Sequence, residues 1–172
     1  MKGRRIAQVR ASGFESSVAV QTMTNGDQHL PRQRDFADSK DDLDGMSAWK
    51  NFGGLTVSAA HQKFCEIPEC YQEDFMFMGG VAFLFYFPVI DRYIRESAVD
   101  DDSDGVEAIW ILAHAINTQF QVPDHSVIES LRSQVQDLVT YVLGHLPQYD
   151  KFPHEQERIG AAWRELQARV AS

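Results

Sequence analysis

The sequence has no hydrophobic run of the length that a membrane-spanning helix needs. Its longest apolar stretch extends only from Phe75 to Ile90 and is interrupted by glycine and proline, whereas a spanning helix needs about 20 apolar residues. The N-terminal region also lacks the apolar core of a secretion signal. We therefore expect a cytoplasmic protein that has no membrane partner.

Cysteine is scarce, and several common enzyme motifs are missing. The two cysteines, Cys65 and Cys70, are expected to be free thiols, because a reducing compartment disfavours disulfides. The sequence contains none of the motifs GxxxxGK[ST], GxGxxG and GxSxG. It therefore predicts neither a nucleotide-binding loop nor a serine nucleophile elbow, and we expect no cofactor.

Basic side chains are also fewer than acidic ones, 16 against 25. The formal net charge is −9 and the pI is about 5.0, and residues 1–45 carry equal numbers of basic and acidic side chains, so the whole excess lies in residues 46–172. Such a surface repels phosphates, which argues against nucleic acid as a partner. It leaves room for a basic protein partner. The oligomeric state stays open.

The remaining sequence predicts an all-α protein. Residues 1–45 are polar and lack periodicity, so we expect a disordered or loosely ordered tail before a single α-helical domain at residues 46–172. Apolar residues recur at helical spacing in about five segments, which favours an irregular helical bundle. The first expected helix is capped by Thr56 and ended by Pro68, and the others are 80–96, 105–120, 127–143 and 154–170, the last with an apolar stripe that includes Trp163.

The segment 75–87 is ambiguous. Two apolar runs flank Gly79 and Gly80, and this arrangement can form a short β-hairpin. We favour a helix from Gly80 that continues through Pro88 to Glu96, because apolar residues keep helical spacing beyond the proline and Val81 is the only β-branched residue of residues 81–87.

One segment carries a resemblance. The run EDFMFMGGVAFLFYFPVIDRYIRE, residues 73–96, resembles a segment of uncharacterised small bacterial helical proteins in its aromatic residues before a proline. The resemblance implies a helical protein of bacterial type. It names no family and brings no functional residues.

The acidic run at residues 100–105 partly matches a calcium loop. An EF-hand loop has oxygen ligands at positions 1, 3 and 5, glycine at position 6 and a bidentate glutamate at position 12. Positions 1, 3, 5 and 6 are filled by Asp100, Asp102, Asp104 and Gly105, but position 12 is Ile111, which cannot bind calcium. The pattern therefore favours the start of a helix over a calcium site.

His61, Cys65 and Cys70 form a second candidate metal set. His61 and Cys65 are four residues apart on one helical face, which can place two zinc ligands together. A fourth ligand could come from His114, His125, His145 or His154, and the spacing does not select one. The same residues can instead be a core thiol and a partly exposed histidine, or a thiol–imidazole pair for nucleophilic chemistry.

Two groups of acidic side chains are candidates for partner binding. The predicted function is a non-catalytic acidic protein-interaction domain, and neutralisation of a basic toxin by an immunity-like protein is one version of it. The alternative is a metal-binding protein or a metal-dependent enzyme that uses one of the two metal sets. The candidate partner-binding residues are Glu66, Glu69, Glu73, Asp74, Asp100, Asp101, Asp102 and Asp104.

Overall fold

The computed structural model describes residues 29–97, 106–122 and 126–172. These residues form helices and connecting turns and contain no strand, as the all-α prediction requires. None of the described helices is both long and apolar enough to cross a membrane. In chain order the elements are α1 (Gln33–Phe36), α2 (Leu43–Phe52), α3 (Val57–Glu66), α4 (Pro68–Tyr71), α5 (Asp74–Phe77), α6 (Gly80–Ser97), α7 (Val106–Gln119), the 3₁₀ helix η1 (Ile128–Leu131), α8 (Arg132–Gly144), α9 (Leu146–Tyr149) and α10 (Pro153–Ala171).

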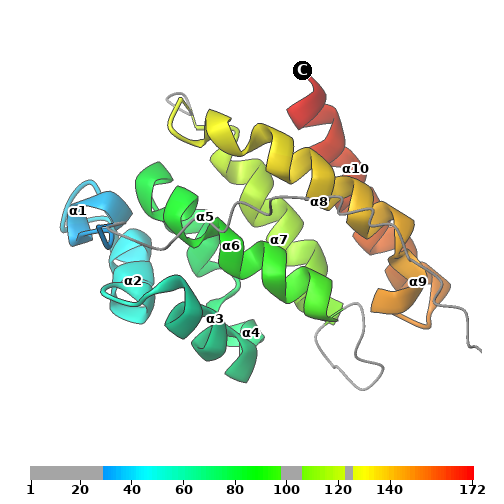
Figure 1. Ribbon diagram of the computed structural model, residues 1–172, viewed down its shortest axis with the longest axis horizontal. Helices are drawn as coiled ribbons and strands as arrows, with labels where there is room; N and C mark the ends of the chain where they lie inside the picture. The colour runs from blue at the N-terminus through cyan, green and yellow to red at the C-terminus, as the bar shows by residue number, and fades with distance from the viewer. Residues whose placement is uncertain (1–28, 98–105, 123–125) are drawn as a thin grey trace, which may run out of the picture.

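Helix α6 runs through the middle of the molecule, between α1 to α3 on one side and α7, α8 and α10 on the other (Figure 1). It packs against α1, α3, α7 and η1. The helix continues through Pro88, as the apolar spacing predicts. Phe83, Phe87, Ile90 and Ile94 are all buried along it, so α6 contributes side chains to most of the core.

The alternative prediction of a short β-hairpin at residues 75–87 is wrong. These residues instead form α5 and the first turns of α6. Gly79 is needed for space and not for a hairpin turn. A Cβ atom at this position would lie 2.5 Å from the backbone oxygen of Asp35. The Gly79 N–H donates to the Phe36 carbonyl at 3.0 Å, so the glycine allows α1 to approach the chain just before α6.

Helix α3 begins and ends as the sequence predicts. The Thr56 side chain accepts a hydrogen bond from the Ala59 N–H at 3.2 Å, which caps the first turn. Pro68 follows the end of α3 and occupies the first position of α4, where its missing N–H has no cost. The break at Pro68 separates the helix of Cys65 from the helix of Cys70.

Residues 29–45 are part of the packed structure, which corrects the expected boundary at residue 45. Phe36 is only 1% exposed, and its ring lies 5.3 Å from that of Trp49 and 5.8 Å from that of Tyr86. A single buried aromatic side chain in a polar stretch produces no periodicity, so the pattern did not reveal it. Residues 1–28 lie outside the described residues.

Helices α7, α8 and α10 form the other side of the bundle (Figure 1). Trp163 of α10 is fully buried, and its indole N–H donates to the Ile109 carbonyl of α7 at 3.0 Å. Asn117 of α7 donates to Glu165 and accepts from Arg169. These polar contacts fix α10 against α7 in addition to the apolar packing between them.

The packing of Phe36 generates a stability prediction. Phe36→Ala should lower the free energy of unfolding by about 3–5 kcal/mol, because it removes a buried aromatic ring. Chemical denaturation followed by circular dichroism would measure this. Phe152→Ala, at a site that is 51% exposed, is the control and should change the value by less than about 0.5 kcal/mol. Equal effects of the two substitutions would contradict the burial of Phe36.

Candidate metal centre

Aromatic packing sets the position of α3 against the C-terminal half of α6. The Phe64 ring of α3 lies 4.8 Å from that of Tyr93 on α6 and 5.3 Å from that of Phe75, both in edge-on geometry. Edge-on aromatic pairs stabilise beyond the area they bury. His61 and Cys65 are the neighbours of Phe64 on the α3 surface, so this contact also turns them toward the last turns of α6.

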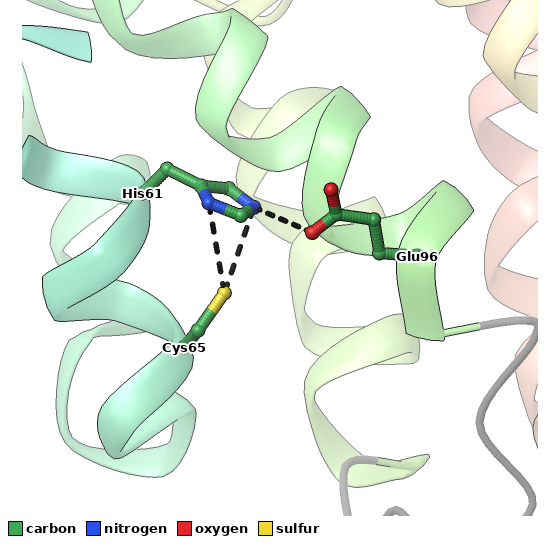
Figure 2. A group of neighbouring side chains, drawn as sticks. All are labelled: His61, Cys65 and Glu96. Carbon is green, nitrogen blue, oxygen red and sulfur yellow. Dashed lines mark hydrogen bonds and ion pairs between the residues drawn. The ribbon is translucent and has the colours of Figure 1, made fainter. Parts of the chain in front are cut away.

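The structure brings His61 and Cys65 together with Glu96 of α6 (Figure 2). The Nε2 atom of His61 lies 3.2 Å from Oε2 of Glu96 and 3.5 Å from Sγ of Cys65. Sγ lies 3.9 Å from Nδ1 of the same ring. The ligand atoms of the three residues all lie within 4.8 Å of one another. We call His61, Cys65 and Glu96 the metal centre.

The three side chains differ in exposure. His61 is buried, with 7% of its surface exposed, whereas Cys65 and Glu96 are exposed. The imidazole is therefore held in place by packing, while the thiol and the carboxylate can adjust their rotamers at the surface. An ion that enters from solvent would meet the exposed sulfur and carboxylate oxygen at the surface and the imidazole at the buried side of the cluster.

Burial determines the protonation of His61. Desolvation lowers the pKa of His61, the positive charge of Arg92 lowers it further, and Glu96 acts in the opposite direction with a smaller effect. The 3.2 Å contact with Glu96 is therefore made by a neutral imidazole, and a metal ion could bind Nε2 only in the tautomer that carries its proton on Nδ1. Neutral imidazole is also the form that binds metal ions.

The surroundings of Cys65 favour the protonated thiol over the thiolate. Burial raises the pKa of Cys65, Glu96 raises it further, and Arg92 acts in the opposite direction. Catalytic cysteines instead have a lowered pKa. In a Cys–His–acid triad the thiol and the acid engage opposite ring nitrogens, but here the sulfur is nearer to Nε2, the nitrogen that faces Glu96. The arrangement does not favour nucleophilic catalysis.

Two of the three ligand separations match those around one tetrahedral ion, and the third, between Sγ of Cys65 and the Glu96 carboxylate, is within 4.8 Å. Zinc binds nitrogen and oxygen at about 2.0–2.1 Å and sulfur at about 2.3 Å, which places adjacent nitrogen and oxygen ligands about 3.4 Å apart and nitrogen and sulfur ligands about 3.5 Å apart. The corresponding separations in the metal centre are 3.2 and 3.5 Å. Three protein ligands would leave one tetrahedral position for water or another donor.

Cys70 does not belong to the metal centre, although the sequence placed it in the candidate set. It lies on α4 and is an exposed free thiol. None of the histidines proposed as a further ligand joins the group in the described part of the chain, and His125 lies outside that part. The third candidate ligand is Glu96, which sequence analysis missed. Its only signal was its position at the end of a predicted helix.

The other predicted site residues are spread over different environments. Glu66, Glu69 and Glu73 are exposed, so a partner-binding role for them stays a prediction. Asp74 is buried and accepts a hydrogen bond from the Asn51 amide at 2.7 Å, and burial raises its pKa. It cannot present its carboxylate to a partner. The remaining candidates, Asp100, Asp101, Asp102 and Asp104, lie outside the described residues.

A groove of about 480 Å³ lies at the other end of α6. No residue of the metal centre lines it, so the two features do not form a single substrate site. Its lining residues are His29, Pro31, Val81, Leu84, Phe85, Pro88, Leu131 and Gln134.

The lowered pKa of His61 predicts a pH effect on stability. The unfolded chain binds a proton to His61 near pH 6.5, whereas the folded protein resists protonation until a lower pH. The free energy of unfolding should therefore fall as the pH drops through about 6.5. In the presence of chelator, His61→Gln should show a smaller fall between about pH 7 and pH 5 than wild type.

His154→Gln is the matched control for loss of a histidine, because the His154 side chain is 75% exposed. Parallel pH profiles of wild type and His61→Gln, measured by denaturation at each pH, would contradict the prediction.

Comparisons of the chain with protein-family models, curated proteins and solved structures found no match. The assignment of the site therefore depends on its own geometry. That geometry is a histidine–cysteine–glutamate cluster shared by α3 and α6, whose ligand atoms lie close enough together that they could hold a metal ion.

Proposed function

We propose that this protein binds a divalent transition metal ion, with zinc as the best match, through His61, Cys65 and Glu96. The observation that carries the proposal is the convergence of three ligand atoms from two helices to within 4.8 Å of one another. The buried imidazole fixes one ligand, and the two exposed ligands close around an ion from the solvent side.

The donor types select the class of metal. Thiolate and imidazole ligands favour zinc and other borderline or soft transition metals. Calcium and magnesium prefer sets made of oxygen ligands. A site with one sulfur, one nitrogen and one carboxylate oxygen should therefore bind zinc or cobalt much more tightly than magnesium.

The protonation states are compatible with metal binding. His61 is neutral, as a ligand must be. The raised pKa of Cys65 means that the thiol keeps its proton until an ion displaces it. Binding should thus release a proton from Cys65, and the affinity should increase with pH.

The two-helix origin of the ligands gives the ion a structural effect. His61 and Cys65 belong to α3, and Glu96 belongs to the last turn of α6. A bound ion would connect these helices at the surface, beyond the aromatic contact between Phe64 and Tyr93. Metal binding should therefore stabilise the native state and restrict the relative motion of the ends of α3 and α6.

Cobalt titration tests the proposal. Purified protein, stripped of metal with chelator and returned to chelator-free buffer, should bind one Co²⁺ per chain and develop a thiolate-to-cobalt charge-transfer absorption. At a free metal concentration of about 100 times Kd, the stability should increase by about 2.7 kcal/mol. Magnesium at the same concentration should have no effect.

Variants identify the ligands. His61→Ala, Cys65→Ser and Glu96→Gln should each weaken binding by more than about 100-fold, because changes outside the first ligand shell already cost about 10–100-fold. Cys70→Ser is the matched control and should retain wild-type affinity, since Cys70 lies outside the metal centre. The proposal fails if wild type binds no cobalt, or if Cys70→Ser removes the charge-transfer absorption as Cys65→Ser does.

A further inference from the structure

Arg92 is a positively charged neighbour of all three residues of the metal centre. Arg92 lies one turn before Glu96 on α6, and its Nε–H donates to Oε1 of Glu96 at 2.7 Å. The other oxygen of the same carboxylate, Oε2, faces His61. The charge of Arg92 also lowers the pKa of both His61 and Cys65, so its field extends over the imidazole and the thiol as well.

We propose that Arg92 is a built-in competitor for the metal ion: its guanidinium shares the Glu96 carboxylate with an incoming cation and weakens metal binding by repulsion. The inference depends on the proposed function, because it concerns the strength with which the same centre binds its ion. It assigns Arg92 the role of keeping the centre exchangeable, so that the ion leaves when the free metal concentration falls.

Arg92 has two opposing effects on metal binding. Its hydrogen bond orients Glu96 so that Oε2 points toward His61, and such support usually strengthens a metal site. Its positive charge repels a divalent cation. The sign of the net effect depends on which of these contributions is larger.

The repulsion should be the larger effect. The Arg92 and Glu96 side chains are 58% and 51% exposed, and exposed ion pairs between residues one helical turn apart contribute little. Repulsion acts on the net positive charge that the centre gains when a divalent ion replaces the thiol proton. A guanidinium offers the ion no compensating contact, because it has no lone pair with which to bind a metal. We therefore expect removal of the charge to tighten binding by about fivefold at low salt.

The experiment compares Co²⁺ affinity in wild type, Arg92→Gln and Arg92→Lys at two salt concentrations. In about 0.01 M salt, where the Debye length is about 30 Å, Arg92→Gln should bind Co²⁺ about fivefold more tightly than wild type. Arg92→Lys keeps the charge and should stay within about twofold of wild type. In about 1 M salt the difference between wild type and Arg92→Gln should fall below about twofold.

A remote arginine controls for net charge. Arg34 lies on α1, at the opposite end of α6 from the metal centre (Figure 1), and its side chain is 77% exposed. Arg34→Gln makes the same change of charge and should leave the Co²⁺ affinity unchanged at both salt concentrations. Melting temperatures of all variants in chelator would show that each one folds.

The outcomes separate this inference from the proposed function. If wild type binds no Co²⁺, the proposed function fails and the role of Arg92 fails with it. If wild type binds Co²⁺ but Arg92→Gln binds equally or more weakly at low salt, only the competitor role is overturned and orientation of Glu96 is the main effect. Equal tightening by Arg34→Gln and Arg92→Gln would also overturn it, because the effect would then come from net charge.

Discussion

The structure depends on helix α6 remaining continuous through Pro88. Proline has no N–H to donate to the Leu84 carbonyl one turn earlier, and its ring crowds the preceding turn, at a cost of about 3 kcal/mol in a helix interior. Pro88 is exposed, so the ring lies on the outer face of α6, where it lines the groove together with Leu84. On the inner face, Phe87 and Val89 are buried beside the proline. Burial of both flanking residues offsets the break in the hydrogen-bond ladder.

The continuity of α6 also positions the metal centre. Tyr93 belongs to the core and Glu96 to the surface, yet they are three residues apart on neighbouring positions of one helix. On α3, Phe64, which packs on Tyr93, lies three residues from His61 and next to Cys65. The aromatic contact therefore determines the separation between the thiol and the carboxylate. A shift of the core at Phe64 would change the distances within the centre, although no ligand had been altered.

Local signals in the sequence predicted most of the helices. Thr56, the apolar spacing across Pro88 and the stripe that includes Trp163 each mark an element that the structure contains. The hairpin hypothesis failed because a glycine pair signals a turn only when the backbone needs unusual torsion angles. Gly79 meets a need for space against α1 instead. The burial of Phe36 was missed for a related reason, since tertiary packing of one residue leaves no periodic pattern.

The candidate site shows where such local reasoning stops. The pairing of His61 with Cys65 follows from their spacing within one helix, but Glu96 joins them only because α3 packs across the end of α6. This third residue also changes the chemistry. A histidine and a cysteine alone are equally compatible with a nucleophile and with a metal ligand pair. With the carboxylate and the sulfur both nearest to Nε2, the thiol and the acid do not engage opposite ring nitrogens as they do in a triad, and the arrangement favours the proposed metal ligands over a nucleophile.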